Sequence, residues 1–187
     1  MNQKIYQILT SKNVTALRES SMYLLSCFPD LSIDLDAFLV ERGQIQDTLF
    51  PTVELMPGVH KLVHHLKKHN IPIAVATSSR RRDYNLITAH LQSLFECFEG
   101  KVVCGDDVKY NMKGKPAPDI FITAAREMLN RDVGHPQALE TDIHVEERRK
   151  GLVFEDSLLG MQGGKRAGMS GMFFNAFIKS PMLNKVL

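Results

Sequence analysis

The sequence predicts an α/β fold with a doubly wound parallel sheet. From Met56 onward, short apolar runs alternate with longer segments of helical periodicity, the arrangement that builds parallel sheets. The run Ile71–Ala76 is apolar throughout, as expected for a strand buried on both faces. The chain has 187 residues, 44% of them hydrophobic and 24% charged, which suits one globular domain with at most a small satellite.

Residues 1–50 carry helical periodicity interrupted by Pro29, and nothing in them resembles a strand. Residues 51–187 should form the α/β part. The long, charged segment Asn130–Lys150 is expected to be a surface insertion. The helices expected in the second zone cover residues 59–69 (closed by Asn70), 83–94, 116–129 and 158–167, and the strands cover residues 71–76, 101–104, 151–154 and 171–174.

Hydroxyl residues follow the first expected strand directly, at Thr77 and Ser78. In open α/β sheets, ligands bind beyond the carboxyl ends of the strands. The Thr77 hydroxyl and the backbone N–H groups that follow it would suit phosphate oxygens. Taken alone, either residue would more often cap the next helix, so this alternative stays open.

A lysine and two acids occupy comparable positions later in the chain. Lys115 precedes Pro116, whose ring biases Lys115 away from helix, and a lysine there can neutralise a phosphoryl charge. Glu155 and Asp156 follow the apolar run Leu152–Phe154, and their carboxylates suit Mg²⁺. Taken in isolation, Lys115 would more often be a solvated surface lysine, and Asp156 would more often be a helix N-cap. The spacings of about 40 residues leave room for one helix–strand unit each, so all three positions should reach one edge of the sheet.

Together, these stretches resemble the haloacid dehalogenase-like (HAD) phosphohydrolases. Thr77 matches the second motif of that family, Lys115 the third, and the pair Glu155-Asp156 the fourth. The stretches at residues 55–59, 114–121 and 153–169 look like the subgroup of sugar-phosphate phosphatases and phosphomutases, and residues 66–79 and 105–107 look most like pseudouridine-5′-phosphatases. The resemblance implies a Rossmannoid core over residues 51–187, with residues 1–50 as the remnant of a helical cap.

The resemblance also implies an activity: hydrolysis of a small phosphate monoester, a sugar phosphate or a nucleoside 5′-monophosphate such as pseudouridine 5′-phosphate. An aspartate would attack phosphorus to give an aspartyl-phosphate. Thr77, Ser78 and Lys115 would bind the phosphate, and Asp156 and Glu155 would bind Mg²⁺. The alternative is a catalytically inactive, truncated relative that at most binds phosphate and Mg²⁺.

The nucleophile of this chemistry, expected in a D-x-D-G-[TV] motif ahead of Thr77, is not found. Only Asp34-Leu35-Asp36-Ala37-Phe38 imitates the motif, and no buried strand precedes it. We interpret Ser32 or Asp34 as a helix N-cap and assign no catalytic residue. The core should then lack its first strand, which leaves its two neighbours about 9–10 Å apart unless another segment fills the slot or they pair directly. We therefore expect an incomplete chain, in which Met1 is a wrong or alternative start of a longer protein.

Bulk properties narrow the partners. A net charge of +2 gives no argument for nucleic acid or for acidic membranes, and no apolar run is long enough to cross a bilayer. Three cysteines without a C-x-x-C pair predict no disulfide framework. The basic run Arg80–Arg82 is expected to be a solvated helix start, and the pairs His60/His64 and His65/His69 to be surface residues. From these features we expect a monomer that is cytoplasmic, or also nuclear, and that binds neither nucleic acid nor membranes. The family resemblance implies a small phosphorylated metabolite as its partner.

Overall fold

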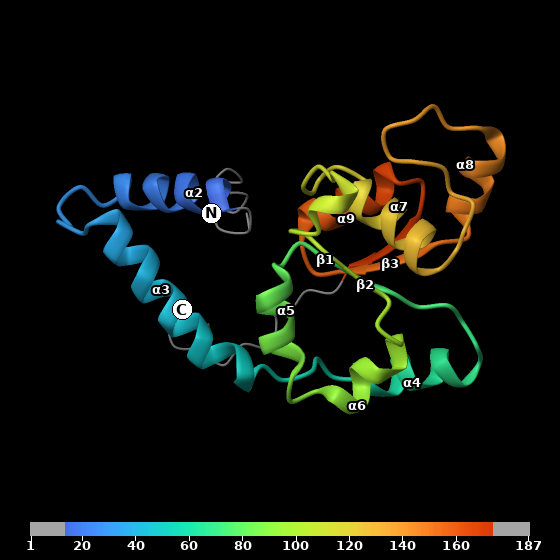
Figure 1. The fold of residues 1–187 in the computed structure, drawn as a ribbon, viewed down its shortest axis with the longest axis horizontal. Coiled ribbons are helices and arrows are strands. Elements are labelled where there is room, and N and C mark those ends of the chain that lie inside the picture. Colours follow the sequence, from blue (N-terminus) through green and yellow to red (C-terminus); the bar gives the residue numbers. More distant parts are fainter. Residues whose placement is uncertain (1–13, 174–187) are drawn as a thin grey trace.

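The structure, a computed structural model, describes residues 14–173, and helices and short strands alternate along most of that range (Figure 1). The longer elements are α2 (Val14–Ser26), α3 (Leu35–Leu49), α4 (Val59–Lys68), β1 (Val75–Thr77), α5 (Arg81–Thr88), α6 (Gln92–Phe95), β2 (Val102–Cys104), α7 (Asp119–Thr123), α8 (Asp142–Arg149), β3 (Leu152–Glu155), α9 (Leu158–Arg166) and β4 (Ser170–Phe173). Short 3₁₀ turns η1 (Phe50–Thr52), η2 (Glu96–Phe98) and η3 (Val108–Tyr110) and a π-helical turn η4 (Ala124–Met128) connect them.

The strands form two parallel pairs. β1 pairs with β2, with Thr77 opposite Cys104, and β3 pairs with β4, with Glu155 opposite Phe173. Within residues 14–173, no ladder joins one pair to the other. The predicted α/β fold with parallel strands is therefore confirmed. Direct pairing of β1 with β3, one of the alternatives left open for the missing strand, does not occur in this part of the chain.

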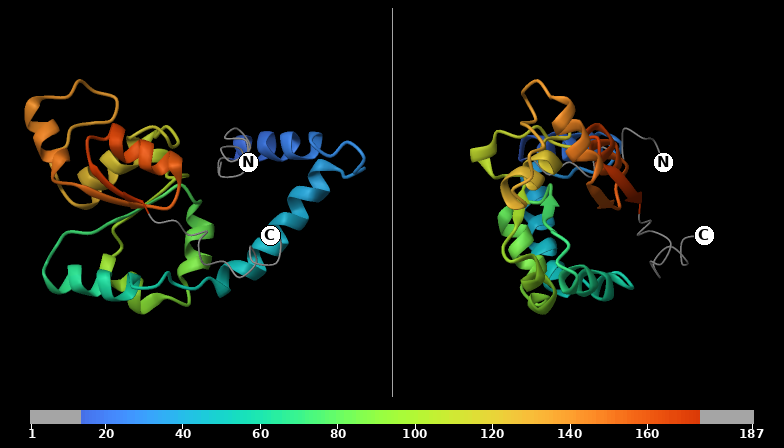
Figure 2. Two further views of the ribbon diagram at one scale, coloured as in Figure 1. Left: turned by 180° about the vertical axis from the view of Figure 1, so that it is seen from behind. Right: turned by 90° about the vertical axis from the view of Figure 1, so that its right-hand side faces the viewer.

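Both pairs rest on one hydrophobic core. The π-helical turn η4 continues α7, and α7 contacts β1, β2 and α9, while α9 contacts β3 and β4. These helices lie on one side of the strands (Figures 1 and 2). Buried apolar side chains fill the space between helices and strands: Val103, Ile120, Phe121, Ile122, Ala124, Val133, Val153 and Ala167.

The first strand is shorter than predicted. Asn70 adopts a left-handed conformation after α4, and the Ile71 N–H still bonds back to Leu66. Pro72 has no N–H to give to a ladder, so inter-strand bonding begins at Val75, whose N–H donates to the Lys101 carbonyl. The strand is only half-buried and Ile71 is exposed, so the prediction of a strand over residues 71–76 buried on both faces is wrong in extent and burial.

Two predicted helices are also broken. The helix expected over residues 83–94 begins earlier, ends at Thr88 and resumes as α6 after a turn at Leu91. The helix expected to run to residue 129 is α-helical only to Thr123 and continues as the π-helical turn η4. The remaining predicted elements match the observed ones within one or two residues.

The segment Asn130–Lys150 is more than a surface insertion. It contains α8, and Val133 within it is 2% exposed and belongs to the core. The buried Arg148 side chain donates from Nε to the Val133 carbonyl at 2.7 Å and from Nη1 to Glu140 at 2.6 Å. These two bonds hold α8 against Val133 within the segment, and the burial of Val133 anchors the segment in the core. The predicted surface insertion therefore also contributes a residue to the core.

The amino-terminal helices stand to one side. α2 and α3 contact each other and lie apart from the strands (Figures 1 and 2). No residue of α3 is buried. Asp34 is the N-cap of α3 and accepts from the Ala37 N–H at 2.8 Å, which confirms its predicted capping role. The division into a cap remnant (1–50) and a core (51–187) stays a prediction.

Candidate functional site

Thr77 ends β1 and begins a tight turn. Its Oγ1 accepts from the Ser79 N–H at 3.1 Å. The cap residue of the following helix α5 is Arg80, whose side chain makes no capping hydrogen bond. The N–H of Arg81, the first residue of α5, donates instead to Asp106 Oδ1. The alternative role of Thr77 or Ser78 as a simple helix cap therefore does not apply. Both hydroxyl residues are partly exposed at the carboxyl end of a strand, as the predicted phosphate site requires.

The neighbouring backbone is packed tightly against this turn. A Cβ atom on Gly105 would lie 2.5 Å from the Ser78 carbonyl oxygen, closer than real contacts allow. The Gly105 N–H donates to the Ser79 carbonyl at 3.0 Å. The loop after β2 thus holds the Thr77–Ser79 turn from one side, and only glycine fits where the two backbones approach.

Lys115 and Glu155 form an ion pair between Nζ and Oε1. The two side chains are 12% and 8% exposed, so the pair is largely shielded from water. The ammonium also lies 5.0 Å from the centre of the Phe121 ring, within cation–π distance. Two residues predicted for different ligands, phosphate and metal, therefore contact each other.

Asp156 differs from Glu155 in its surroundings. Asp156 is exposed immediately beyond the end of β3, whereas Glu155 is buried. Ser157 follows as the N-cap of α9 and accepts from the Gly160 N–H at 3.0 Å. Mg²⁺ binds through one or two protein carboxylates and keeps several waters, so the exposed Asp156 suits it as a partial ligand set. Among the described residues, no three His, Cys, Asp or Glu side chains are grouped to hold a metal ion.

The structure brings together only part of the predicted set. Lys115 and Glu155 are in contact, and Asp156 is adjacent in sequence. Within residues 14–173, no hydrogen bond or ion pair links Thr77 or Ser78 to these three. Sequence analysis missed the direct Lys115–Glu155 pair and the supporting residues Ser157 and Gly160. A serine after an acidic pair is a readable N-cap signal, whereas the role of Gly160 depends on packing that no local pattern displays.

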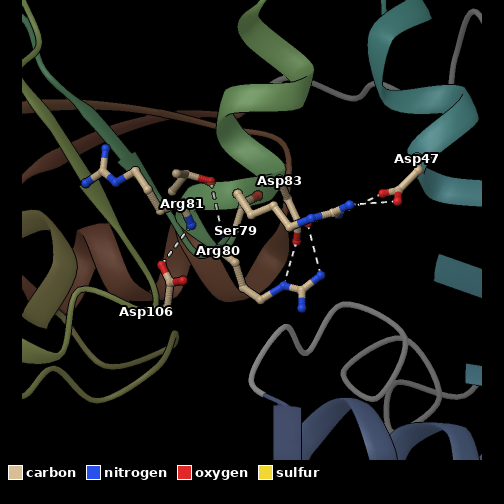
Figure 3. A network of polar contacts seen from close by, with 8 residues as sticks. Asp47, Ser79, Arg80, Arg81, Asp83 and Asp106 are labelled. Carbon is tan, nitrogen blue, oxygen red and sulfur yellow. Dashed lines mark hydrogen bonds and ion pairs between the residues drawn. The ribbon is translucent and has the colours of Figure 1, made fainter. Parts of the chain in front are cut away.

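The three arginines after the turn each form an ion pair with a carboxylate. Figure 3 shows Arg80 beside Asp83 and the backbone of Arg81 beside Asp106. The Arg80 side chain donates a hydrogen bond to Asp83. The Arg81 side chain donates to Asp107, and its backbone N–H donates to Asp106. The Arg82 side chain donates two hydrogen bonds to Asp47 of α3. The Arg82 hydrogen bond lowers the pKa of Asp47. The basic run is therefore balanced by acids, and Arg82 also ties α3 to α5.

One histidine pair has a cysteine neighbour that the sequence did not suggest. The Cys97 Sγ lies 3.6 Å from His64 Nδ1, while the predicted surface position of all four histidines is confirmed. Cys27 is exposed and Cys104 is buried, and burial raises the pKa of the Cys104 thiol to about 11. These three cysteines are free, as expected. No helix in the described part of the chain has the length and apolar character to span a bilayer.

Most of the chain is similar to known hydrolases. A sequence model of the haloacid dehalogenase-like hydrolases matches residues 26–168. The chain is 41% identical over 139 residues to "(DL)-glycerol-3-phosphatase 2" of Arabidopsis thaliana, covering 74% of this chain and 52% of the relative. It is 37% identical over 140 residues to "Probable pseudouridine-5'-phosphatase" of Drosophila melanogaster, covering 75% and 54%.

A solved structure has a similar fold. The match is a HAD hydrolase of family IA, variant 3, from Entamoeba histolytica, with a TM-score of 0.61 and 21% identity over 99% of this chain and 74% of the other. The chain spans about half the length of the curated relatives it matches. The predicted resemblance in family and subgroup is confirmed, and the solved structure supports the fold alone.

Proposed function

Because the chain belongs to the haloacid dehalogenase-like hydrolase family, we propose that it supplies the phosphate- and metal-binding part of a phosphatase site for small phosphate monoesters. The substrate class is a sugar or polyol phosphate or a nucleoside 5′-monophosphate, such as glycerol 3-phosphate or pseudouridine 5′-phosphate, after the relatives' names. The observation that carries the proposal is the position of Thr77 and Asp156 at the carboxyl ends of β1 and β3, where α/β proteins bind ligands.

In this proposal each residue has a defined task. The Thr77 hydroxyl and the N–H groups of its turn donate hydrogen bonds to phosphate oxygens, and the Lys115 ammonium offsets their charge. Asp156 is a ligand of Mg²⁺, with Glu155 beside it. Bound there, Mg²⁺ would stabilise the charge that develops on the phosphoryl oxygens.

Hydrolysis also needs a nucleophile. An aspartate carboxylate attacks phosphorus, the bond to the leaving alkoxide breaks, and water hydrolyses the resulting aspartyl-phosphate. Asp34 is engaged as the N-cap of α3 and is not a candidate. We propose that a strand carrying the nucleophile belongs between β1 and β3, which are not paired with each other among the described residues. Residues 1–50 would act as part of a cap that selects the substrate, and the protein would act as a cytoplasmic monomer.

Two measurements on the 187-residue chain test this proposal. The first is binding of inorganic phosphate in the presence of Mg²⁺, by calorimetry. We expect Thr77→Val and Asp156→Asn each to weaken binding at least tenfold, because each removes a ligand-binding oxygen. Thr52→Val, which alters an exposed hydroxyl outside the site, is the control.

The second measurement is phosphate release from glycerol 3-phosphate and pseudouridine 5′-phosphate. Binding without release would support the non-catalytic alternative for this chain. Release that Asp34→Asn abolishes would show that the capping role is not the only role of Asp34. Failure to bind either phosphate or Mg²⁺ would refute the proposal.

A further inference from the structure

We infer that Glu155 is a positioning residue, whose buried carboxylate fixes the Lys115 ammonium in a space that Gly160 keeps open, and that Asp156 is the carboxylate of the acidic pair that remains for metal. This inference rests on the proposed function in taking Asp156 as a Mg²⁺ ligand and Lys115 as a phosphate-binding group. It changes the expected role of Glu155 from metal ligand to counter-ion.

The oxygens of Glu155 are already engaged. Oε1 pairs with the Lys115 ammonium. Oε2 accepts from the Ser157 hydroxyl at 3.0 Å and lies 3.4 Å from the Ser157 N–H. A carboxylate ligand must offer a lone pair toward an accessible metal, and the Glu155 side chain is almost fully enclosed.

Gly160 defines the space that Glu155 occupies. A Cβ atom on Gly160 would overlap the Glu155 carboxyl carbon and its Oε2. Gly160 is buried in α9, so a side chain at this position would displace the Glu155 carboxylate. The first turn of α9 is thus built around the Glu155 side chain, with Ser157 and Gly160 on the same turn.

The pairing also gives the Lys115 ammonium a partner in a place shielded from water. An unpaired buried ammonium carries a large desolvation cost, which a well-placed carboxylate offsets. An ammonium has three N–H donors, and Glu155 together with the Phe121 ring restricts how they are directed. Lys115 is therefore held in a set orientation before any phosphate binds, so less ordering is needed on binding.

Chemical labelling tests the positioning without any metal or substrate. With limiting sulfo-N-hydroxysuccinimide acetate and mass spectrometry, we expect Lys115 to react at least fivefold more slowly than the exposed Lys61. In Glu155→Gln, the Lys115 rate should rise at least threefold while the Lys61 rate stays unchanged. An unchanged Lys115 rate in a variant that still folds would overturn the inference.

The role of Gly160 is tested by coupling two substitutions, read from the melting temperature. Gly160→Ala should lower the melting temperature of the parent, and should lower it by less than a third as much in a Glu155→Ala background, where the carboxylate is gone. Gly43→Ala, at a position with open space, is the control and should shift both backgrounds equally. Equal losses from Gly160→Ala in both backgrounds would contradict the inference.

Metal binding separates the inference from the proposed function. Glu155→Gln alone would leave Lys115 unpaired and repel Mg²⁺, so the matched variant is Lys115→Met/Glu155→Gln, which removes both charges together. We expect the double variant to bind Mg²⁺ within threefold of the parent, and Asp156→Asn to bind at least tenfold more weakly. Tenfold loss in the double variant would make Glu155 a ligand and overturn the inference. No loss in Asp156→Asn would instead refute the metal part of the proposed function, with the labelling result unaffected.

Discussion

Glu99 shows how a single surface residue makes stability depend on pH. Its carboxylate accepts hydrogen bonds from Lys101, two residues further along the chain, and from Lys67 of α4. These bonds, that of Lys101 above all, lower the pKa of Glu99 from 4.5 to about 2. Because the folded state binds the proton less readily than the unfolded chain, Glu99 stabilises the fold above about pH 4.5, and this contribution is lost as the pH falls toward 2.

We expect Glu99→Gln to reduce the loss of stability between pH 4.5 and pH 2, while lowering stability near neutral pH. Urea midpoints measured across this range for the parent and the variant give the difference. The comparison isolates one carboxyl group, since all others are common to both chains. Parallel pH profiles for the two proteins would show that the lysine contacts of Glu99 have no energetic effect.

Asp34 is the second residue whose role can be separated by substitution. It caps α3 through its side-chain oxygen, a role that asparagine can fill and alanine cannot. We therefore expect Asp34→Ala to destabilise α3 by about 0.5–2 kcal/mol and Asp34→Asn to have little effect. Amide hydrogen exchange within α3 measures this local change, and equal exchange in both variants would contradict the capping role.

Among the elements, α9 depends on glycines for its close packing. A Cβ atom on Gly163 would lie 3.0 Å from the Phe121 ring and 3.1 Å from the Ala117 carbonyl oxygen. α9 thus approaches the segment around α7 closely enough that one methyl group would have to displace backbone. Helix formation alone would favour alanine at this position, so the glycine reflects packing rather than propensity.

We expect Gly163→Ala to destabilise the protein by about 1–3 kcal/mol through overpacking. Gly43→Ala, in the exposed α3 where nothing lies within 4 Å, should stabilise its helix by about 0.5–1 kcal/mol. Chemical denaturation of the two variants gives both values. If Gly163→Ala lowers the free energy of unfolding by no more than the size of the change from Gly43→Ala, α9 can move away from the segment around α7 without an energetic cost.

At this scale the sequence predicted element type well and element length less well. The apolar runs and their flanking Gly, Asn and Ser residues located all four strands of the described range and the start of α9. The break after Thr88 and the π-helical turn after Thr123 were missed, because no Gly or Pro marks either position. In the site, the residue types were predictable, but the pairing of Lys115 with Glu155 in a space that Gly160 leaves was not.

In the whole molecule, Arg148 holds α8 against Val133, the residue of the segment 130–150 that lies in the core. Its side chain is 6% exposed and satisfies the carbonyl of the buried Val133, whereas the next residue, Arg149, is 65% exposed and pairs with Glu146. Adjacent arginines on one helix therefore have opposite surroundings. This contrast allows the insertion to be tested against a control that differs in position by one residue.

We expect Arg148→Met to cost about 1–3 kcal/mol, because it leaves the Val133 carbonyl without its donor. Arg149→Met should change stability by less than about 0.5 kcal/mol, as exposed ion pairs contribute little. Thermal unfolding of both variants tests this. If Arg148→Met and Arg149→Met both change stability by less than about 0.5 kcal/mol, the bond from Arg148 to Val133 does not contribute to the stability of the protein.

The two separate strand pairs have a consequence for the behaviour of the protein at high concentration. Within residues 14–173 no ladder joins the two pairs, and on β3 the apolar Leu152 side chain is 52% exposed. An exposed apolar side chain favours association with other chains, and a charge in its place disfavours it. At concentrations well above those at which the protein acts as a monomer, purified chains should therefore self-associate, and Leu152→Lys should keep them dispersed in a light-scattering measurement.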